Sequence, residues 1–386
     1  MWLSDMRLVL ADRVVENGCL RIEGGMIAEI VEQPGAGSGH TIYPGFIDMH
    51  GDMIEHELEP RPGVDFPMGV AVAHLDARLA ASGVTTAYAG VSFSRTANKG
   101  ERRSFEHTTG IIQALKTTIQ DTRVDHRIHA RFDVTYTDAI AALEGLLDAG
   151  AVDLVSVMDH TPGQGQYRNV EKFIAYRMRT GSMSEEQARA QVQVRIDTAV
   201  PAEQLLRNLQ EVSRLCGSRA VAMASHDDDT VEKTNLMADI GAVISEFPVT
   251  MEAAKTAVDR GLMIAMGAPN AMRGQSYSGN LSAREAHAAG LLHILAADYH
   301  PAAILPAIHA LAAQDPDGLV GATRLASANP AKALGLTDRG EIAIGKRADL
   351  AIVDAENRVA KVLLRGEVIH SNGTVRHVTA AAEKAA

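Results

Sequence analysis

The chain of 386 residues carries a formal net charge of −11, and 46% of its residues are apolar while only 4% are aromatic. This length predicts a large α/β domain with a smaller domain attached, and the apolar fraction is sufficient for a sizeable core. The negative charge argues against a nucleic-acid partner but not against a locally basic pocket for an anionic substrate.

The two cysteines and the hydropathy pattern bear on where the protein works. Cys19 and Cys216 are far apart in a large chain, which predicts no disulfide framework and a cytoplasmic location. The first residues lack the basic and then apolar pattern of a secretory signal. The longest apolar stretch, 291–313, contains two prolines, so no membrane span is expected. A homo-oligomer is also expected.

Both ends of the chain are predicted to be strand-rich. Short strands are expected at 7–10, 19–22 and 26–30, with Gly24-Gly25 as a hairpin turn. Strands return within 340–376, and residues 377–386 are expected to form a flexible tail. We predict that 1–43 and 340–376 form one small β-sandwich domain.

Residues 44–339 alternate short apolar runs with amphipathic stretches, which predicts a parallel sheet with helices between its strands. Expected helices include 70–82, 106–119, 202–215 and 279–290. The expected strands are 42–49, 84–91, 126–134, 152–158, 220–225, 241–247, 262–267 and 292–297. Eight strands predict a closed, TIM-like (β/α)₈ barrel, with an open doubly wound sheet as the alternative.

Potential metal ligands follow several of these strands. His50 and Asp52 end the first strand and share one face, because alternate strand residues point the same way. Further candidates follow the fourth, fifth, sixth and eighth strands, and a barrel would bring all of them to one mouth. They are His160, with Asp159 as its alternative, His226, Glu246 and Asp298. This set predicts one or two divalent ions, Zn²⁺ first and Mn²⁺ or Fe²⁺ next, although each residue could instead cap a helix.

A second group of residues could bind phosphate. The Gly-rich loop after the seventh strand contains Arg273, Ser276, Ser278 and Asn280, and barrels often bind phosphate at this position. Arg61, between two prolines, and Lys172 could add positive charge. The alternative is that all six are solvent-exposed surface residues.

Longer motifs resemble a known superfamily. The runs 44–50 and 345–350 are similar to the two ends of amidohydrolase superfamily members, which usually have a second histidine where this chain has Asp52 and a histidine where it has Glu246. With those two differences, seven further runs resemble the family of alpha-D-ribose 1-methylphosphonate 5-triphosphate diphosphatases of the carbon–phosphorus lyase pathway. They are 60–67, 156–164, 224–228, 246–250, 266–270, 273–280 and 298–299.

This resemblance implies a small phosphorylated substrate, a ribose 5-triphosphate, from which pyrophosphate is released during phosphonate catabolism. It also implies that Asp298 orients or deprotonates the attacking water. Two rival functions are an amide or lactam hydrolase and a catalytically inactive scaffold. Gly51 and His56 differ from the family's usual residues, so a paralogue with another substrate is the main alternative.

Overall fold

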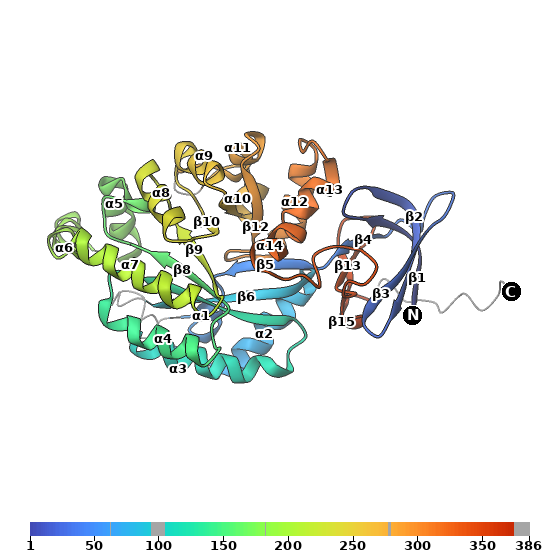
Figure 1. Ribbon diagram of the computed structural model, residues 1–386, viewed down its shortest axis with the longest axis horizontal. Coiled ribbons are helices and arrows are strands. Elements are labelled where there is room, and N and C mark those ends of the chain that lie inside the picture. The colour runs from blue at the N-terminus through green and yellow to red at the C-terminus, as the bar shows by residue number, and fades with distance from the viewer. Residues whose placement is uncertain (62, 94–104, 182, 277–278, 374–386) are drawn as a thin grey trace.

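The computed structural model describes residues 1–61, 63–93, 105–181, 183–276 and 279–373. It contains an eight-stranded sheet surrounded by helices and a seven-stranded sheet at one end of the molecule (Figure 1). The predicted tail at 377–386 lies outside the described residues. None of the described helices is long and apolar enough to cross a membrane.

The eight-stranded sheet has the topology of a (β/α)₈ barrel, which confirms the predicted fold. Its strands follow chain order and each pairs in parallel with the next. The first and last strands meet through a bridge between Gly51 and Asp298. The strands are β5 (Phe46–Gly51), β6 (Val84–Phe93), β7 (Asp125–Asp133), β8 (Leu154–Met158), β9 (Ala222–His226), β10 (Ile244–Glu246), β11 (Met263–Gly267) and β12 (Leu292–Ala296).

Helices cover the outside of this barrel, and local capping sets where several begin. The predicted helix at 279–290 begins only at Ala283, because Ser282 and Glu285 form a capping box there. The α-helices are α1 (Ile54–Leu58), α2 (Met68–Ala81), α3 (Phe105–Thr118), α4 (Ile140–Asp148), α5 (Val170–Gly181), α6 (Glu185–Asp197), α7 (Ala202–Gly217), α8 (Val231–Asp239), α9 (Met251–Asp259), α10 (Ala268–Arg273), α11 (Ala283–Ala288), α12 (Ile304–Ala312), α13 (Gly318–Arg324) and α14 (Ala328–Ala333).

The second sheet combines both ends of the chain. All seven strands belong to one hydrogen-bonded sheet, in the order β15-β14-β13-β4-β1-β2-β3, and they enclose a separate apolar cluster. Its strands are β1 (Trp2–Val9), β2 (Val14–Glu23), β3 (Met26–Glu32), β4 (Thr41–Pro44), β13 (Leu350–Val353), β14 (Val359–Leu364) and β15 (Glu367–Ser371). Strand β4 lies between β1 and β13 and thereby joins the two ends.

The predicted strand at 42–49 is in fact two strands in different sheets. Pro44 ends β4 in the second sheet and Phe46 begins β5 in the barrel, so Gly45 is the point of transfer. A Cβ on Gly45 would lie 2.3 Å from Thr85 Oγ1, so the close approach to β6 leaves no room for a side chain.

An ion-pair network connects the amino-terminal end of the barrel strands to the segment that leads into β13. Asp125, at the start of β7, pairs with Arg339 and lies 3.5 Å from Arg347 Nη1. Both guanidinium groups are buried, with side chains 5% and 3% exposed. Burial alone would raise the pKa of Asp125, but its arginine neighbours lower it below its usual value.

We expect Asp125→Asn to lower stability near neutral pH by about 2 kcal/mol, because two buried guanidinium groups lose a counter-charge. Since the folded state depresses the pKa of Asp125, its stabilisation is present above the unfolded-state value of 3.8 and is lost as the pH falls below it. The melting temperatures of the wild type and of Asp125→Asn, measured from pH 7 to pH 3, should therefore converge as the pH falls. Asp148→Asn, which alters an exposed pair with Arg219, is the control and should shift stability little.

Candidate active site

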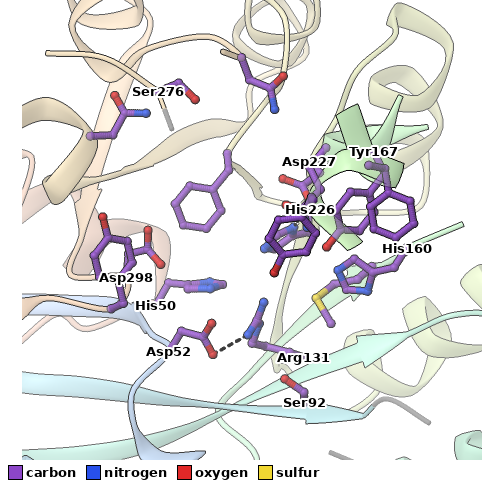
Figure 2. A pocket seen from close by; sticks show the side chains of 18 of the residues that line it. His50, Asp52, Ser92, Arg131, His160, Tyr167, His226, Asp227, Ser276 and Asp298 are labelled. Carbon is purple, nitrogen blue, oxygen red and sulfur yellow. Dashed lines mark hydrogen bonds and ion pairs between the residues drawn. The ribbon is translucent and has the colours of Figure 1, made fainter. Parts of the chain in front are cut away.

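A cavity of about 980 Å³ opens at the carboxyl ends of the barrel strands, where active sites of such barrels lie. Its volume is at the upper end of the range of roughly 300–1,000 Å³ that ligand sites occupy. Figure 2 shows His50, Asp52, Arg131, His226 and Asp298 facing this space, from β5, β7, β9 and β12 or the residues that follow these strands. Every one of the six predicted metal ligands except Glu246 lines the cavity.

Three residues within two positions of the ends of barrel strands adopt a left-handed backbone conformation that is uncommon for residues other than glycine. Asp227 follows β9, Phe247 follows β10 and Asp298 follows β12, with φ values of 55°, 54° and 57°. Each donates its backbone N–H to the neighbouring strand, to Glu246 O, Ala265 O and His50 O. The sheet hydrogen bonding thus continues one or two residues beyond each strand, and all three side chains line the cavity.

A cluster of three donors lies at the cavity floor, where His50 lines the cavity and the other two donors lie beneath it. His50, His129 and Glu246 each offer one ligand atom, and these atoms lie within 4.8 Å of one another. His50 Nδ1 is 3.2 Å from Glu246 Oε2, and His129 Nε2 is 3.7 Å from Glu246 Oε1. All three side chains are essentially inaccessible to solvent. It is the one group of this kind found among the described residues.

The donor chemistry of this cluster fits a divalent metal ion. His50 Nδ1, His129 Nδ1 and both Glu246 carboxylate oxygens are buried without an aligned hydrogen-bond partner among the described residues. Such groups are costly to bury unless something else satisfies them. Two imidazoles and a carboxylate match the three protein ligands of a catalytic zinc site, which leaves a fourth position open.

Two of the three pKa shifts in this cluster suit metal ligands, which must be a neutral imidazole or an ionised carboxylate. Burial is the main reason why the pKa of His129 lies well below its usual value, so its imidazole is neutral. Burial alone would raise the pKa of Glu246, but the two histidines lower it below its usual value, so the carboxylate is ionised. Burial alone would lower the pKa of His50, but the charge of Glu246 outweighs it and raises that pKa.

Asp52 lies at the cavity floor but is paired with an arginine. Arg131 Nη1, from β7, donates to Asp52 Oδ1 at 2.7 Å. The two side chains are 11% and 24% exposed, so the pair faces the cavity from a largely buried position (Figure 2). The structure therefore places Asp52 outside the three-donor cluster and next to a fixed positive charge.

The remaining predicted ligands surround this floor. The rings of His226 and His50 are 5.6 Å apart, and His226 Nδ1 lies 3.0 Å from Asp227 Oδ2. His160 Nδ1 is 3.4 Å from Asp133 Oδ2. Asp298 lies where β12 meets β5, and burial, more than any neighbouring charge, raises its pKa. His160, His226 and Asp298 thus border the cavity without joining the three-donor cluster.

Comparisons with known proteins establish the family. The model of the amidohydrolase family matches residues 73–378. The chain belongs to the amidohydrolase family. It is 37% identical over 362 residues to the alpha-D-ribose 1-methylphosphonate 5-triphosphate diphosphatase of Escherichia coli (strain K12), covering 91% of this chain and 94% of that one.

Solved structures agree on the fold of this amidohydrolase. N-acetyl-D-glucosamine-6-phosphate deacetylase from Mycobacterium smegmatis aligns with a TM-score of 0.63 at 17% identity, covering 96% of this chain and all of that one. The 5-methylcytosine deaminase of Klebsiella pneumoniae aligns with a TM-score of 0.66 at 16% identity, covering 96% and 97%. At such low identities the likeness supports the barrel fold and not a substrate.

The predicted phosphate-binding residues of this amidohydrolase divide into two groups. Arg273, at the end of α10, lines the cavity with Ser276 and Asn280 from the loop that follows. Arg61 is exposed and is not among the described lining residues. Lys172 is also absent from that lining, although a Cβ on Gly279 would lie 3.3 Å from its Nζ. Ser278 lies outside the described residues.

Two residues that the structure places at the site of this amidohydrolase, His129 and Arg131, were missing from the predicted set. His129 and Arg131 belong to the third barrel strand, which continues to Asp133, so neither is at a strand end. The sequence did offer a signal, because an alternating pair of polar residues inside an otherwise buried strand requires buried partners. Those partners are Ser156, whose Oγ lies 2.8 Å from His129 Nε2, and Asp52 for Arg131.

Proposed function

We propose that this amidohydrolase is a metal-dependent diphosphatase that releases pyrophosphate from alpha-D-ribose 1-methylphosphonate 5-triphosphate. The observation that carries the proposal is the position of the Arg131 guanidinium, which shares a cavity floor with His50 of the donor cluster. A phosphoanhydride needs positive charge beside the reacting phosphorus, whereas an amide does not. The 37% identity to the E. coli diphosphatase over most of both chains supports the same reaction.

In this proposal His50, His129 and Glu246 hold one divalent ion, with Zn²⁺ preferred and Mn²⁺ or Fe²⁺ as alternatives. Such an ion, when bound, lowers the pKa of water and stabilises negative charge on a phosphoryl oxygen. Asp52 fixes the guanidinium of Arg131 through the 2.7 Å contact, so that it can stabilise charge on the reacting phosphate without reorganising.

Asp298 is the proposed proton acceptor. It faces the cavity from the seam between β12 and β5, and its backbone N–H bonds to His50 O at 2.9 Å. This bond fixes the backbone of Asp298 beside His50 of the donor cluster. A carboxylate whose pKa burial has raised is a better base than an exposed one, which suits it to take the proton of the attacking water.

The two positions at which the chain departs from the diphosphatase pattern do not oppose this substrate. Gly51 is buried, and a Cβ there would lie 2.9 Å from Asp48 Oδ2. His56 is exposed on α1. Neither is among the described residues that line the cavity, so neither is placed to select a substrate directly. A paralogue that acts on an amide or lactam is therefore the second candidate only.

The test combines metal analysis with pyrophosphate release. Protein containing about one equivalent of Zn²⁺ should release pyrophosphate from the ribose triphosphate and leave a ribose 5-phosphate. Arg131→Gln should lower this rate about 100-fold or more, while Arg61→Gln, at an exposed position, is the control and should leave it unchanged. Metal-loaded protein that releases no pyrophosphate, or an Arg131→Gln variant with full activity, would contradict the proposal.

A further inference from the structure

A helical hairpin forms one side of the cavity and packs as a unit of its own. Helices α5 and α6 are inserted between β8 and α7, at the end of the barrel farthest from the second sheet (Figure 1). They share a small apolar cluster, separate from the barrel core, that includes Phe173, Ile174, Ala188 and Val192. On the outside, Arg189 of α6 bonds to Glu171 of α5. The hairpin therefore presents a defined surface to the cavity.

That surface is aromatic. Tyr167 precedes α5, and its ring lies 4.2 Å from the ring of Phe173, which in turn stacks at 6.5 Å on Tyr176. All three line the cavity. Burial raises the pKa of Tyr167 to about 12, so its hydroxyl group stays protonated and able to donate. A row of rings with hydroxyl groups offers both apolar surface and hydrogen bonds.

Two guanidinium groups accompany these rings on the same wall. Arg195 of α6 lies with its Cζ 5.7 Å from the ring centre of Phe173, and its Nη2 donates to His160 O at 3.1 Å. Arg177 of α5 donates to Gln191 Oε1 at 3.0 Å. Both line the cavity. Their bonds hold them at this wall, where an Arg fork can bind a phosphonate or phosphate group.

The facing wall has a different chemistry. It carries Arg273, Ser276 and Asn280, which offer a guanidinium, a hydroxyl and an amide. Figure 2 shows Ser276 and Tyr167 on different sides of the cavity, with His50 and Arg131 at the floor between them. The cavity of a protein with a net charge of −11 thus has positive groups on two separated walls as well as at its floor.

This arrangement matches a substrate that is anionic at both ends and reacts in the middle. If the reacting phosphorus lies at the floor, the pyrophosphate leaves on one side and the sugar extends to the other. Pyrophosphate has no apolar surface, so the polar wall at Arg273 suits it. The sugar has C–H faces that can pack on the rings of Tyr167 and Tyr176, and its 1-phosphonate can then reach Arg177 and Arg195.

We propose that the α5–α6 hairpin is the specificity element of this enzyme, in which Arg177 and Arg195 bind the anionic 1-substituent of the ribose. This inference rests on the proposed function for its substrate. It adds that an anionic group at C1, and not only the triphosphate, is recognised. Ribose 5-triphosphate without that group should therefore be a poorer substrate.

Calorimetric titration tests the inference without requiring catalysis. The probes are the two products that differ at C1 only, alpha-D-ribose 1-methylphosphonate 5-phosphate and ribose 5-phosphate. Wild-type protein should bind the first more tightly, and Arg177→Gln and Arg195→Gln should each weaken its binding roughly 10- to 100-fold. Binding of ribose 5-phosphate should change less than about threefold, and Arg→Lys at either position should restore part of the loss.

Arg189→Gln is the matched control, because it removes an exposed ion pair between the same two helices but does not border the cavity. It should bind both probes as wild type does. The assignment would be overturned if Arg177→Gln and Arg195→Gln lost affinity equally for both probes or for neither. The same loss of affinity in Arg189→Gln would also overturn it. Selective loss in a protein that releases no pyrophosphate would support the 1-substituent site while refuting the proposed diphosphatase reaction.

Discussion

Replacing Glu246 by glutamine is expected to remove the bound metal and to lower pyrophosphate release by about 10³-fold or more. Glu246 is completely buried and is the one carboxylate of the three-donor cluster. Glutamine keeps the size of the side chain but removes the charge that His50 and His129 stabilise, and its amide nitrogen is no metal ligand. Elemental analysis of dialysed protein and the pyrophosphate assay measure the two effects.

Glu55→Gln is the matched control for this experiment. Glu55 is also buried, 4% exposed, but its carboxylate accepts from the backbone N–H and the hydroxyl of Ser92. Glutamine can keep both contacts, because its amide oxygen accepts from the Ser92 backbone N–H and its NH₂ group can donate to the Ser92 hydroxyl. This variant should therefore keep its metal. Full metal content in Glu246→Gln, with a wild-type melting temperature, would mean that the ion is held elsewhere. Loss of the metal in His226→Ala would then show that the ligands are those around His226.

The barrel could be predicted because its strands are buried on both faces and therefore form continuous apolar runs. All eight expected strands overlap observed ones, from Phe46–Gly51 to Leu292–Ala296. The same property hid the break at Gly45, since an apolar run does not reveal that its two halves pair in different sheets. In the folded chain, Gly45 lies so close to Thr85 that no side chain fits at the point where the chain changes sheet.

The structure brings part of the predicted set of site residues together and adds residues that strand ends alone do not reveal. The strand-end search placed His50 and Glu246 at one point, and the structure has His50 Nδ1 3.2 Å from Glu246 Oε2, but the search assumed that all strands end at one level. Strands in a barrel are tilted and staggered, so a residue in the middle of β7, His129, reaches the level of His50 and Glu246. Likewise, Asp52 has the chemistry of a ligand, and only the fold shows that Arg131 from another strand is paired with it.

The second large effect is expected for Asp298→Asn, which should lower the turnover rate by about 10²- to 10⁴-fold while the metal content stays unchanged. Asn tolerates the left-handed backbone that Asp298 adopts, with φ of 57°, so the bridge to Gly51 should persist. The amide cannot accept the proton that the carboxylate is proposed to take. Single-turnover pyrophosphate release, elemental analysis and product binding separate the loss of a base from the loss of a ligand or of substrate affinity.

Asp159→Asn serves as the control for Asp298→Asn, because Asp159 accepts from Thr161 N–H and is not among the described lining residues. It should turn over as wild type does. If Asp298→Asn loses its metal together with its activity, Asp298 is a ligand in addition to the three buried donors. If Asp298→Asn retains its metal and its activity, the proton is accepted by another group at the cavity floor. His226 would then be the first to test, because its Nε2 is buried without a hydrogen-bond partner among the described residues.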